Sequence, residues 1–304
     1  MLNKKQAWLP ITLSLLAFTT GCVPNNFTFK QEFGGSGSKA GEFLSATDMD
    51  INKRGDLVIA DAGNTRFQVV STNGNSLTTG GEFGTDRLKL QSVAGIGVDK
   101  IQDVIWVCDQ KGNKLVRFDA DGIPDKRVSK NMKYPMDVAA DKDGNIYVIM
   151  TRCPDIYKYS VNGEYIGKIG GSGKTALTFP TSISIFKDEI YVTDFAAKRI
   201  VKMSLDGNFI DEIRQKGQYE EMKGPSGLHI DEDGNLYVLD LGEVPVVVLN
   251  PKGDLISQIG NFGNQVGDFL YPTGVVAKSN SDIYVLDNSR NTVINFRKKS
   301  EKPE

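Results

Sequence analysis

The 304-residue sequence contains one histidine, three cysteines and two tryptophans. A catalytic zinc takes about three protein ligands, so a single His leaves few ways to build a zinc site. A single His also limits the chain to at most one Ser-His-Asp triad. No Gly-x-Ser-x-Gly nucleophile elbow is present either. Two glycine-rich stretches, 34–37 and 170–173, lack the Lys-Ser/Thr ending of a phosphate-binding loop and are interpreted as connectors. We therefore expect no metal and no cofactor.

An excess of positive charge is also missing. The chain has 36 Lys and Arg against 38 Asp and Glu, and binding to phosphates requires clustered basic residues. No nucleic-acid partner is expected. The densest basic cluster includes Arg297, Lys298 and Lys299 beside the C-terminus, where we expect a disordered, charged tail over residues 298–304.

The N-terminus has the pattern of an export signal. Lys4 and Lys5 precede an apolar run from Ala7 to Phe18, which is shorter than the roughly 20 residues needed to span a bilayer. The following Gly21-Cys22 resembles the lipobox of bacterial lipoproteins, although Thr19 stands where Leu is usual. The resemblance implies cleavage after residue 21, lipid on Cys22 and a tether over 22–26. The alternative is an ordinary signal peptide with a chance Cys.

The lipid on Cys22 makes a membrane the first expected partner. Val23, rather than Asp, follows the Cys, a pattern that resembles outer-membrane sorting in enterobacterial lipoproteins. The expected location is therefore the cell envelope, on the periplasmic side of the outer membrane if the organism is Gram-negative.

The strongest signal in the sequence is an internal repeat. Six segments read like Tyr-Val-x-Asp, and their last positions are spaced 48, 41, 44, 46 and 47 residues apart. These positions are Asp61, Asp109, Met150, Asp194, Asp240 and Asp287. Periods of about 40–50 residues with several short strands per unit are typical of propeller blades. We predict an all-β, six-bladed β-propeller with four-stranded antiparallel blades.

The sixth repeat stops after its third strand, and the missing strand is found at the other end of the mature chain. Residues 27–33 alternate Phe with polar residues and precede Gly34-Gly35. We predict that this N-terminal strand completes the last blade and closes the ring, which leaves only short, protected edges. The propeller should span residues 27–297.

Two stretches in particular resemble the NHL repeat: residues 267–274 followed by 283–287 and Asn291, and Gly41-Glu-Phe43 followed by 61–70. NHL propellers include scaffolds, RNA-binding modules, receptor sensor domains and a peptide-amidating lyase, so the resemblance is specific for fold and not for function. The lyase resembled here holds zinc through channel His residues. The matching positions are Thr47, Ala94, Met136, Thr181, Ser226 and Thr273, none of them His.

Most recurring polar residues have a structural interpretation. The Asp residues that end second strands can accept backbone N–H bonds. Arg66, Lys114, Arg199 and Asn291 follow them closely, where some could pair with an Asp of the same or a neighbouring blade. Cys108 occupies a mostly apolar position, so a buried free thiol is expected rather than a bridge to Cys153.

Positions that break the repeat are the candidate ligand-binding residues. Asp48 and Asp137 are acidic residues at the start of first strands, where small residues are usual. Asp50 and His229 are exceptions two positions further along their strands. Met150, Arg152 and Glu243 interrupt the loops of the third and fifth repeats. Solvated channel lining and repeat drift are the alternative interpretation. Asp48, Asp50 and Asp137 also leave open a calcium site like that of six-bladed lactonases.

The sequence thus favours an anchored binding or scaffolding propeller without catalytic activity, with a protein or small-ligand partner on one face. Loops carried by a rigid frame are where binding residues concentrate. The alternative is an exported metal-dependent lyase or hydrolase with its site in the central channel.

Replacing Cys22 with Ser should move the protein from the membrane fraction to the soluble exported fraction, because the lipid supplies the attachment. Fractionation followed by intact mass measurement checks this. Wild-type protein that is already soluble and carries no lipid would show that the anchor is absent.

Overall fold

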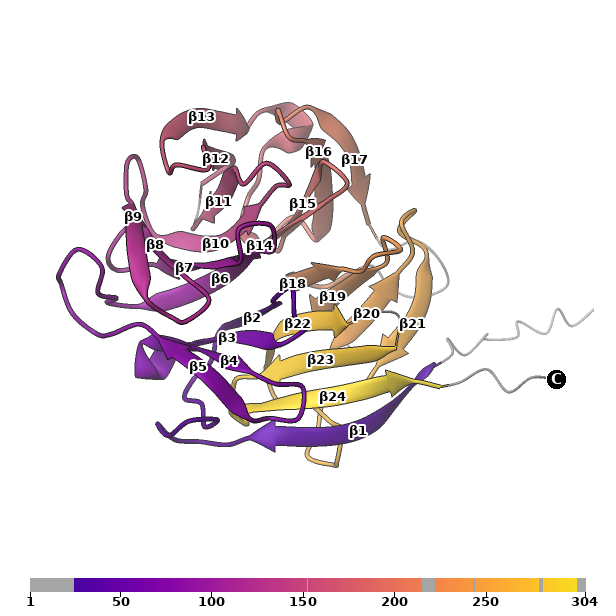
Figure 1. Ribbon diagram of the computed structural model, residues 1–304. Coiled ribbons are helices and arrows are strands. Elements are labelled where there is room, and N and C mark those ends of the chain that lie inside the picture. Colours follow the sequence, from indigo (N-terminus) through magenta and orange to yellow (C-terminus); the bar gives the residue numbers. More distant parts are fainter. Residues whose placement is uncertain (1–24, 152, 215–221, 243, 279–280, 300–304) are drawn as a thin grey trace, which may run out of the picture.

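The computed structural model describes residues 25–151, 153–214, 222–242, 244–278 and 281–299. These residues form six sheets of four antiparallel strands, arranged around a common axis (Figure 1). Two short 3₁₀ turns, Ala62–Asn64 and Gly173–Thr175, are the only helical elements in the described ranges. The predicted six-bladed propeller is confirmed.

Each blade begins with its innermost strand, and each innermost strand contacts the innermost strands of both neighbouring blades. Blades 1 to 3 comprise β2 Asp48–Ile51, β3 Leu57–Asp61, β4 Arg66–Val70, β5 Ser76–Gly80; β6 Val93–Asp99, β7 Val104–Asp109, β8 Lys114–Phe118, β9 Pro124–Val128; and β10 Pro135–Ala140, β11 Ile146–Met150, β12 Asp155–Tyr159, β13 Tyr165–Gly170. Blades 4 to 6 comprise β14 Pro180–Phe186, β15 Glu189–Asp194, β16 Arg199–Ser204, β17 Phe209–Ile213; β18 Pro225–Ile230, β19 Leu236–Asp240, β20 Val246–Leu249, β21 Leu255–Ile259; and β22 Pro272–Lys278, β23 Asp282–Asp287, β24 Thr292–Lys298, with β1 Phe27–Gly34.

Five of the six innermost strands begin earlier than the sequence predicts, whereas β2 begins at Asp48 as predicted. In blade 5, residues 224–227 are expected to be a loop, yet β18 starts at Pro225, which lies opposite Asp240. Proline is tolerated at the first residue of a strand because its missing N–H need not join the ladder. A register shift follows immediately, between Pro225 and Gly227. The same shift recurs at the start of β6, β10, β14 and β22.

The ring is closed by the N-terminal strand, as predicted. β1 pairs antiparallel with β24, so blade 6 has the order β1-β24-β23-β22 (Figure 1). Lys298, expected in the tail, is the last residue of β24 and lies opposite Phe27. Its N–H donates to the Ser281 carbonyl at 2.7 Å, which holds this end of the strand in place. Residues 300–304 of the expected tail lie outside the described residues.

A bulge divides the closing strand into two parts that face different blades. The register of β1 against β24 shifts between Phe29 and Gln31, which reverses the side-chain alternation beyond that point. Phe27 packs in a cluster with residues of blade 5, including Ile259, whereas Phe33 packs against a cluster that contains Phe43 of the segment entering blade 1. The alternation of Phe with polar residues suggests that all three phenylalanines pack on one face of the strand, and the bulge prevents this.

The hydrophobic core is circular because it lies between blades. Its six buried clusters each combine residues from neighbouring blades, as where Tyr147 and Ile149 of β11 pack with Ile183 and Val192 of blade 4. Second strands such as β3 are buried along their whole length. Each blade is thus stabilised by both neighbours, and the closing strand contributes to the last two contacts of the ring.

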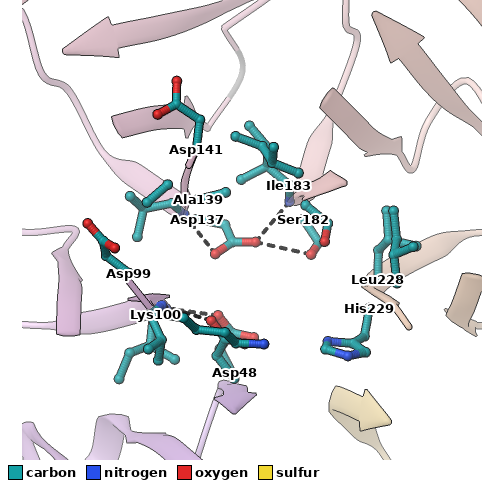
Figure 2. Close-up of a pocket in the computed structure, with 18 of the residues that line it drawn as sticks. Asp48, Asp99, Lys100, Asp137, Ala139, Asp141, Ser182, Ile183, Leu228 and His229 are labelled. Atoms are coloured by element: carbon teal, nitrogen blue, oxygen red, sulfur yellow. Dashed lines mark hydrogen bonds between the residues drawn. The ribbon is translucent and has the colours of Figure 1, made fainter. Parts of the chain in front are cut away.

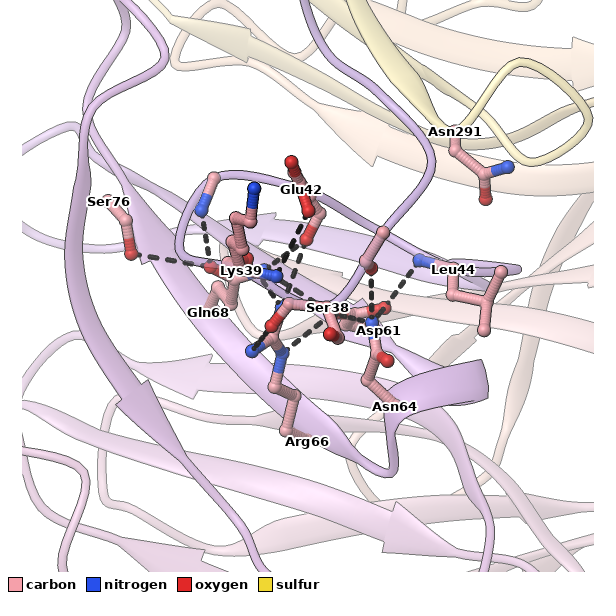
Figure 3. A network of polar contacts seen from close by, with 12 residues as sticks. Ser38, Lys39, Glu42, Leu44, Asp61, Asn64, Arg66, Gln68, Ser76 and Asn291 are labelled. Carbon is pink, nitrogen blue, oxygen red and sulfur yellow. Dashed lines mark hydrogen bonds and ion pairs between the residues drawn. The ribbon is translucent and has the colours of Figure 1, made fainter.

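The Asp at the end of a second strand fastens the chain segment that enters the same blade. Asp61 accepts the Leu44 N–H at 2.8 Å and pairs with Arg66 Nε at 2.8 Å (Figure 3). Arg66 also donates to the Ser38 carbonyl at 2.7 Å. Corresponding backbone N–H groups reach the other four carboxylates, at Asp109, Asp194, Asp240 and Asp287. The structural interpretation of these residues is confirmed.

Two of the predicted same-blade pairs repeat this arrangement, and one residue bridges blades. Lys114 lies 3.6 Å from Asp109, and Arg199 lies 3.5 Å from Asp194. Asn291 of blade 6 accepts the Ser45 N–H at 2.7 Å, which ties the last blade to the first. These contacts hold the loops of one face against the sheets beneath them.

Two phenylalanines of the closing strand offer a matched test. Phe27 is 6% exposed and Phe29 is 38% exposed, so Phe27→Ala should lower the free energy of unfolding by about 3–4 kcal/mol and Phe29→Ala by about 1 kcal/mol. Urea denaturation of the two variants measures the difference. Equal losses of unfolding free energy in the two variants would mean that the buried position of Phe27 does not stabilise the closed ring.

Candidate functional site

The innermost strands leave a central channel that narrows where each strand begins. The residues at this level, which we call the waist, come from the strand start in blade 1, from the bulge in blade 2 and from the first paired position after the bulge in blades 3 to 6. Around the ring they are Asp48, Gly95, Asp137, Ser182, Gly227 and Gly274. A Cβ at Gly95 would collide with the backbone carbonyl of Met136 in the next blade. Glycine at such waist positions therefore reflects the close approach of neighbouring strands.

The two acidic waist residues fasten one blade to the next. Asp48 Oδ2 accepts the Ile96 N–H of blade 2 at 2.8 Å. Asp137 Oδ2 accepts the Ile183 N–H of blade 4 at 2.9 Å and the Ser182 hydroxyl at 3.0 Å (Figure 2). The other carboxylate oxygen of each residue accepts the N–H of the residue that follows it. Both candidates predicted from the sequence thus line the channel and also stabilise the ring.

On one side of the waist lies the narrow cavity, of about 220 Å³, which is lined partly by hairpins between first and second strands. Asp50 and His229, both predicted, lie here. Asp50 repeats the blade-to-blade contact, because its Oδ2 accepts the Val98 N–H at 2.8 Å. Burial lowers the pKa of His229 to about 4, against the opposing effect of the Asp50 charge, so this imidazole is neutral at pH 7.

On the other side lies the wide cavity, of about 690 Å³, a size typical of small-ligand sites. Loops between second and third strands form its mouth, where Phe179 and Phe195 make an edge-to-face pair with ring centroids 6.0 Å apart. Leu241 and Tyr271 are other lining residues that are exposed. Among the described lining residues, only Asp48 and Asp137 carry charge.

The wall between mouth and waist was not identified as a ligand surface from the sequence. It is lined by the residues immediately before the waist, which are Thr47, Ala94, Met136, Thr181, Ser226 and Thr273. In blades 3 to 6 these residues lie in the bulge, a feature that re-aims a side chain. In the sequence these six residues recur at one position of the repeat, directly before the waist, but the absence of His excludes them only as zinc ligands.

Burial dominates the electrostatics of the waist. It raises the pKa of Asp48 well above its ordinary range, and repulsion from Asp137 adds to the effect. Burial also raises the pKa of Asp137 to about 7, although hydrogen bonds from Ile183, Val138 and Ser182 oppose the shift. The pair therefore retains a proton at neutral pH, because two close buried carboxylates cannot both be charged cheaply.

The remaining predicted residues have different positions. Met150 is 2% exposed and lines neither cavity; its Sδ accepts the Lys133 N–H at 3.1 Å, as Asp does in the other blades. This placement makes it a core residue rather than a ligand contact. Arg152, Glu243 and Cys22 lie outside the described residues. Cys108 and Cys153 are free thiols, and Cys108 is buried as expected.

The residues of the channel do not fit a resident metal ion. Among the described residues, no group of three or more His, Cys, Asp or Glu side chains is arranged to hold one. Calcium takes six to eight oxygen ligands, whereas the waist offers two carboxylates that already accept backbone N–H groups. The channel is therefore not proposed as a metal site.

No helix in the described ranges is long and apolar enough to cross a membrane.

The sequence matches no protein-family model. Among solved structures, the chain is similar to virginiamycin B lyase from Staphylococcus aureus, with a TM-score of 0.61 and 14% identity over 89% of this chain and 99% of the lyase. A gluconolactonase from Xanthomonas campestris gives 0.62 and 16% over 84% and 87%. A Bacteroides thetaiotaomicron protein of unknown function gives 0.70 and 15% over 90% and 75%. These likenesses show the fold alone.

The waist carboxyls predict a characteristic pH dependence of stability. A carboxyl whose pKa is raised in the folded state holds a proton that the unfolded chain has lost, so its folding contribution declines as pH rises toward the folded pKa. Relative to Asp48→Asn, the unfolding free energy of the wild type should therefore fall as the pH rises from about 4 to about 7.

His229, whose lowered pKa gives the opposite slope between about pH 4 and 6.5, is present in both proteins, so its effect cancels in the comparison. The Asp50 charge contributes to both raised pKa values, so the exposed Asp121→Asn serves as the control instead. Urea melts at each pH measure the effect. Parallel curves for the wild type and Asp48→Asn would contradict the assignment.

Proposed function

We propose that this protein is an exported, lipid-anchored propeller of the NHL type that binds a ligand in the wide cavity without transforming it. The observation that carries the proposal is the cavity itself. It combines a volume of about 690 Å³, aromatic side chains at the mouth and two carboxyls at the waist, the composition expected of a small-ligand site.

The surroundings of the cavity support binding rather than catalysis. Its lining hydroxyls are largely engaged in holding the ring: Thr47 Oγ1 donates to the Ala94 carbonyl at 2.6 Å, and Thr273 Oγ1 to the Ala46 carbonyl at 3.1 Å. No described lining residue pairs a nucleophile with a base in the manner of a hydrolase. A metal-dependent lyase or hydrolase would need a ligand set that the described residues do not supply.

Export and anchoring are supported by the N-terminal pattern, with cleavage before Cys22 and attachment to the outer face of a membrane or to the periplasmic side of an outer membrane. The closed, rigid ring suits such a position, because closure protects the strand edges from pairing with other proteins. The chain enters the propeller at Phe27, on the outermost strand of blade 6 and therefore away from the central channel (Figure 1).

A small-molecule retention experiment tests the function. Immobilised wild-type protein is exposed to a metabolite extract of the producing cells, and retained compounds are compared with those retained by Ser226→Trp, which places an indole inside the wide cavity. Tyr134→Ala, an exposed residue outside the cavity, is the control variant.

We expect compounds that the wild type and Tyr134→Ala retain and that Ser226→Trp loses, and they should be recovered with unchanged mass. Identical retention of compounds by all three proteins would contradict the assignment of the wide cavity as the binding site. Protein-dependent conversion of a retained compound into a product would show that the protein is an enzyme instead.

A further inference from the structure

The floor of the wide cavity has unused capacity to accept hydrogen bonds. A carboxylate offers about four lone-pair sites. Asp48 accepts two N–H groups, from Met49 and Ile96, and Asp137 accepts three donors, from Val138, Ile183 and Ser182. About three acceptor sites therefore remain on the pair, the number of N–H groups on a primary ammonium.

No protein cation supplies the missing charge from within the wide cavity. Its described lining contains no Lys, Arg or His. Lys100 and Lys142 line the narrow cavity on the far side of the waist, and Lys142 pairs with Asp188 at 2.7 Å. The described ion pairs include none to Asp48 or Asp137.

A second polar group in the wall is also left without a partner. Ser226 Oγ is a buried atom with no hydrogen-bond partner among the described residues, and its residue lines the wide cavity. The corresponding hydroxyl of Thr181, one blade earlier, donates to the Pro225 carbonyl at 3.1 Å. Less than 1 Å² of this oxygen is accessible, so a ligand in the cavity meets it only after the Ser226 side chain rotates about χ1.

The mouth combines aromatic and aliphatic side chains with the uncharged polar residues Ser45, Ser92, Gln110 and Asn288. Phe179 and Phe195 stand edge to face, and Tyr271 lies at the rim. Such rings bury the apolar part of a ligand and attract a cation near their faces. A ligand that matches both regions carries a positive group at one end of an apolar body.

We propose that the wide cavity binds a small organic cation whose primary ammonium group sits on Asp48 and Asp137. The apolar body of this ligand lies against the aromatic rings of the mouth. This inference deepens the proposed function and rests on it, since it names the ligand class for the same cavity.

Binding should release a proton. The pair holds a proton at neutral pH chiefly because burial disfavours the charged carboxylates, and also because Asp137 repels Asp48; an ammonium between them offsets both effects. The carboxylic proton then passes to the buffer while the ammonium keeps its own three, so charge and protons balance. Affinity for the cation should accordingly increase from about pH 6 to pH 8.

Calorimetry with three matched probes tests the proposal: 4-phenylbutylammonium, neutral 4-phenylbutan-1-ol and anionic 4-phenylbutanoate. For the wild type at pH 7 we expect the ammonium to bind about tenfold or more tighter than the alcohol, and the carboxylate to bind weakest. The heat of ammonium binding should depend on the ionisation enthalpy of the buffer, as proton release requires.

The double variant Asp48→Asn/Asp137→Asn should reduce the preference for the ammonium to within about twofold, whereas Asp50→Asn, on the other side of the waist, should preserve it. If the double variant does not fold, Asp48→Asn alone and the pH dependence of wild-type affinity give the same information. An affinity that is flat from about pH 6 to 8 would contradict the proposal.

The remaining outcomes separate this inference from the proposed function. Equal binding of ammonium and alcohol, both lost in Ser226→Trp, would leave the cavity as a ligand site and overturn the ammonium assignment. Stoichiometric calcium that disappears in the double variant would overturn it in favour of a metal. Failure of all three probes to bind at millimolar concentration would count against both.

Discussion

The crowding of six innermost strands around one axis is the constraint on which the rest of the structure depends. Neighbouring strands come so close at the waist that Gly95 has no room for a Cβ beside the Met136 carbonyl, and Gly274 has none beside Met49. Where the chain has Asp instead, the carboxylate reaches an N–H of the next blade. The contacts that hold the ring together are therefore also the contacts that place two carboxyl groups in the channel.

Structure and candidate function are linked through this arrangement. Asp48 and Asp137 are buried to make inter-blade hydrogen bonds, and burial raises the pKa of both groups. The cost is tolerated because the N–H donors stabilise the charged form in part. Bulges just before the waist turn Thr181, Ser226 and Thr273 into the cavity wall. The bulges that let the innermost strands begin close to the axis thus also shape the wall of a cavity that is open at one end.

Much of the fold could be predicted from the sequence, because each blade repeats the same signals. The second strands and the turns between strands recur in register, and the missing strand of blade 6 is visible as residues 27–33. The bulge in β1 was not predictable, because it accompanies the packing of Phe33 against blade 1, which the alternation of residues within the strand does not specify. Met150 breaks the repeat yet replaces Asp as an acceptor in the core, so a departure from a pattern does not by itself mark a site. Asp48 and Asp137 were identified because acidic residues stand where glycine or serine is usual, whereas the wall they share with Ser226 emerges only from strand register.

The central claim is that the waist holds two carboxyl groups whose pKa values are raised by burial, so that the pair keeps a proton at neutral pH. Carbon-13 NMR of the Asp side-chain carboxyls, titrated in the wild type and assigned through Asp48→Asn and Asp137→Asn, measures this directly. The account predicts that Asp137 titrates near pH 7 and that Asp48 titrates well above its ordinary value of 3.8. Titration of both carboxyls near that ordinary value would contradict it.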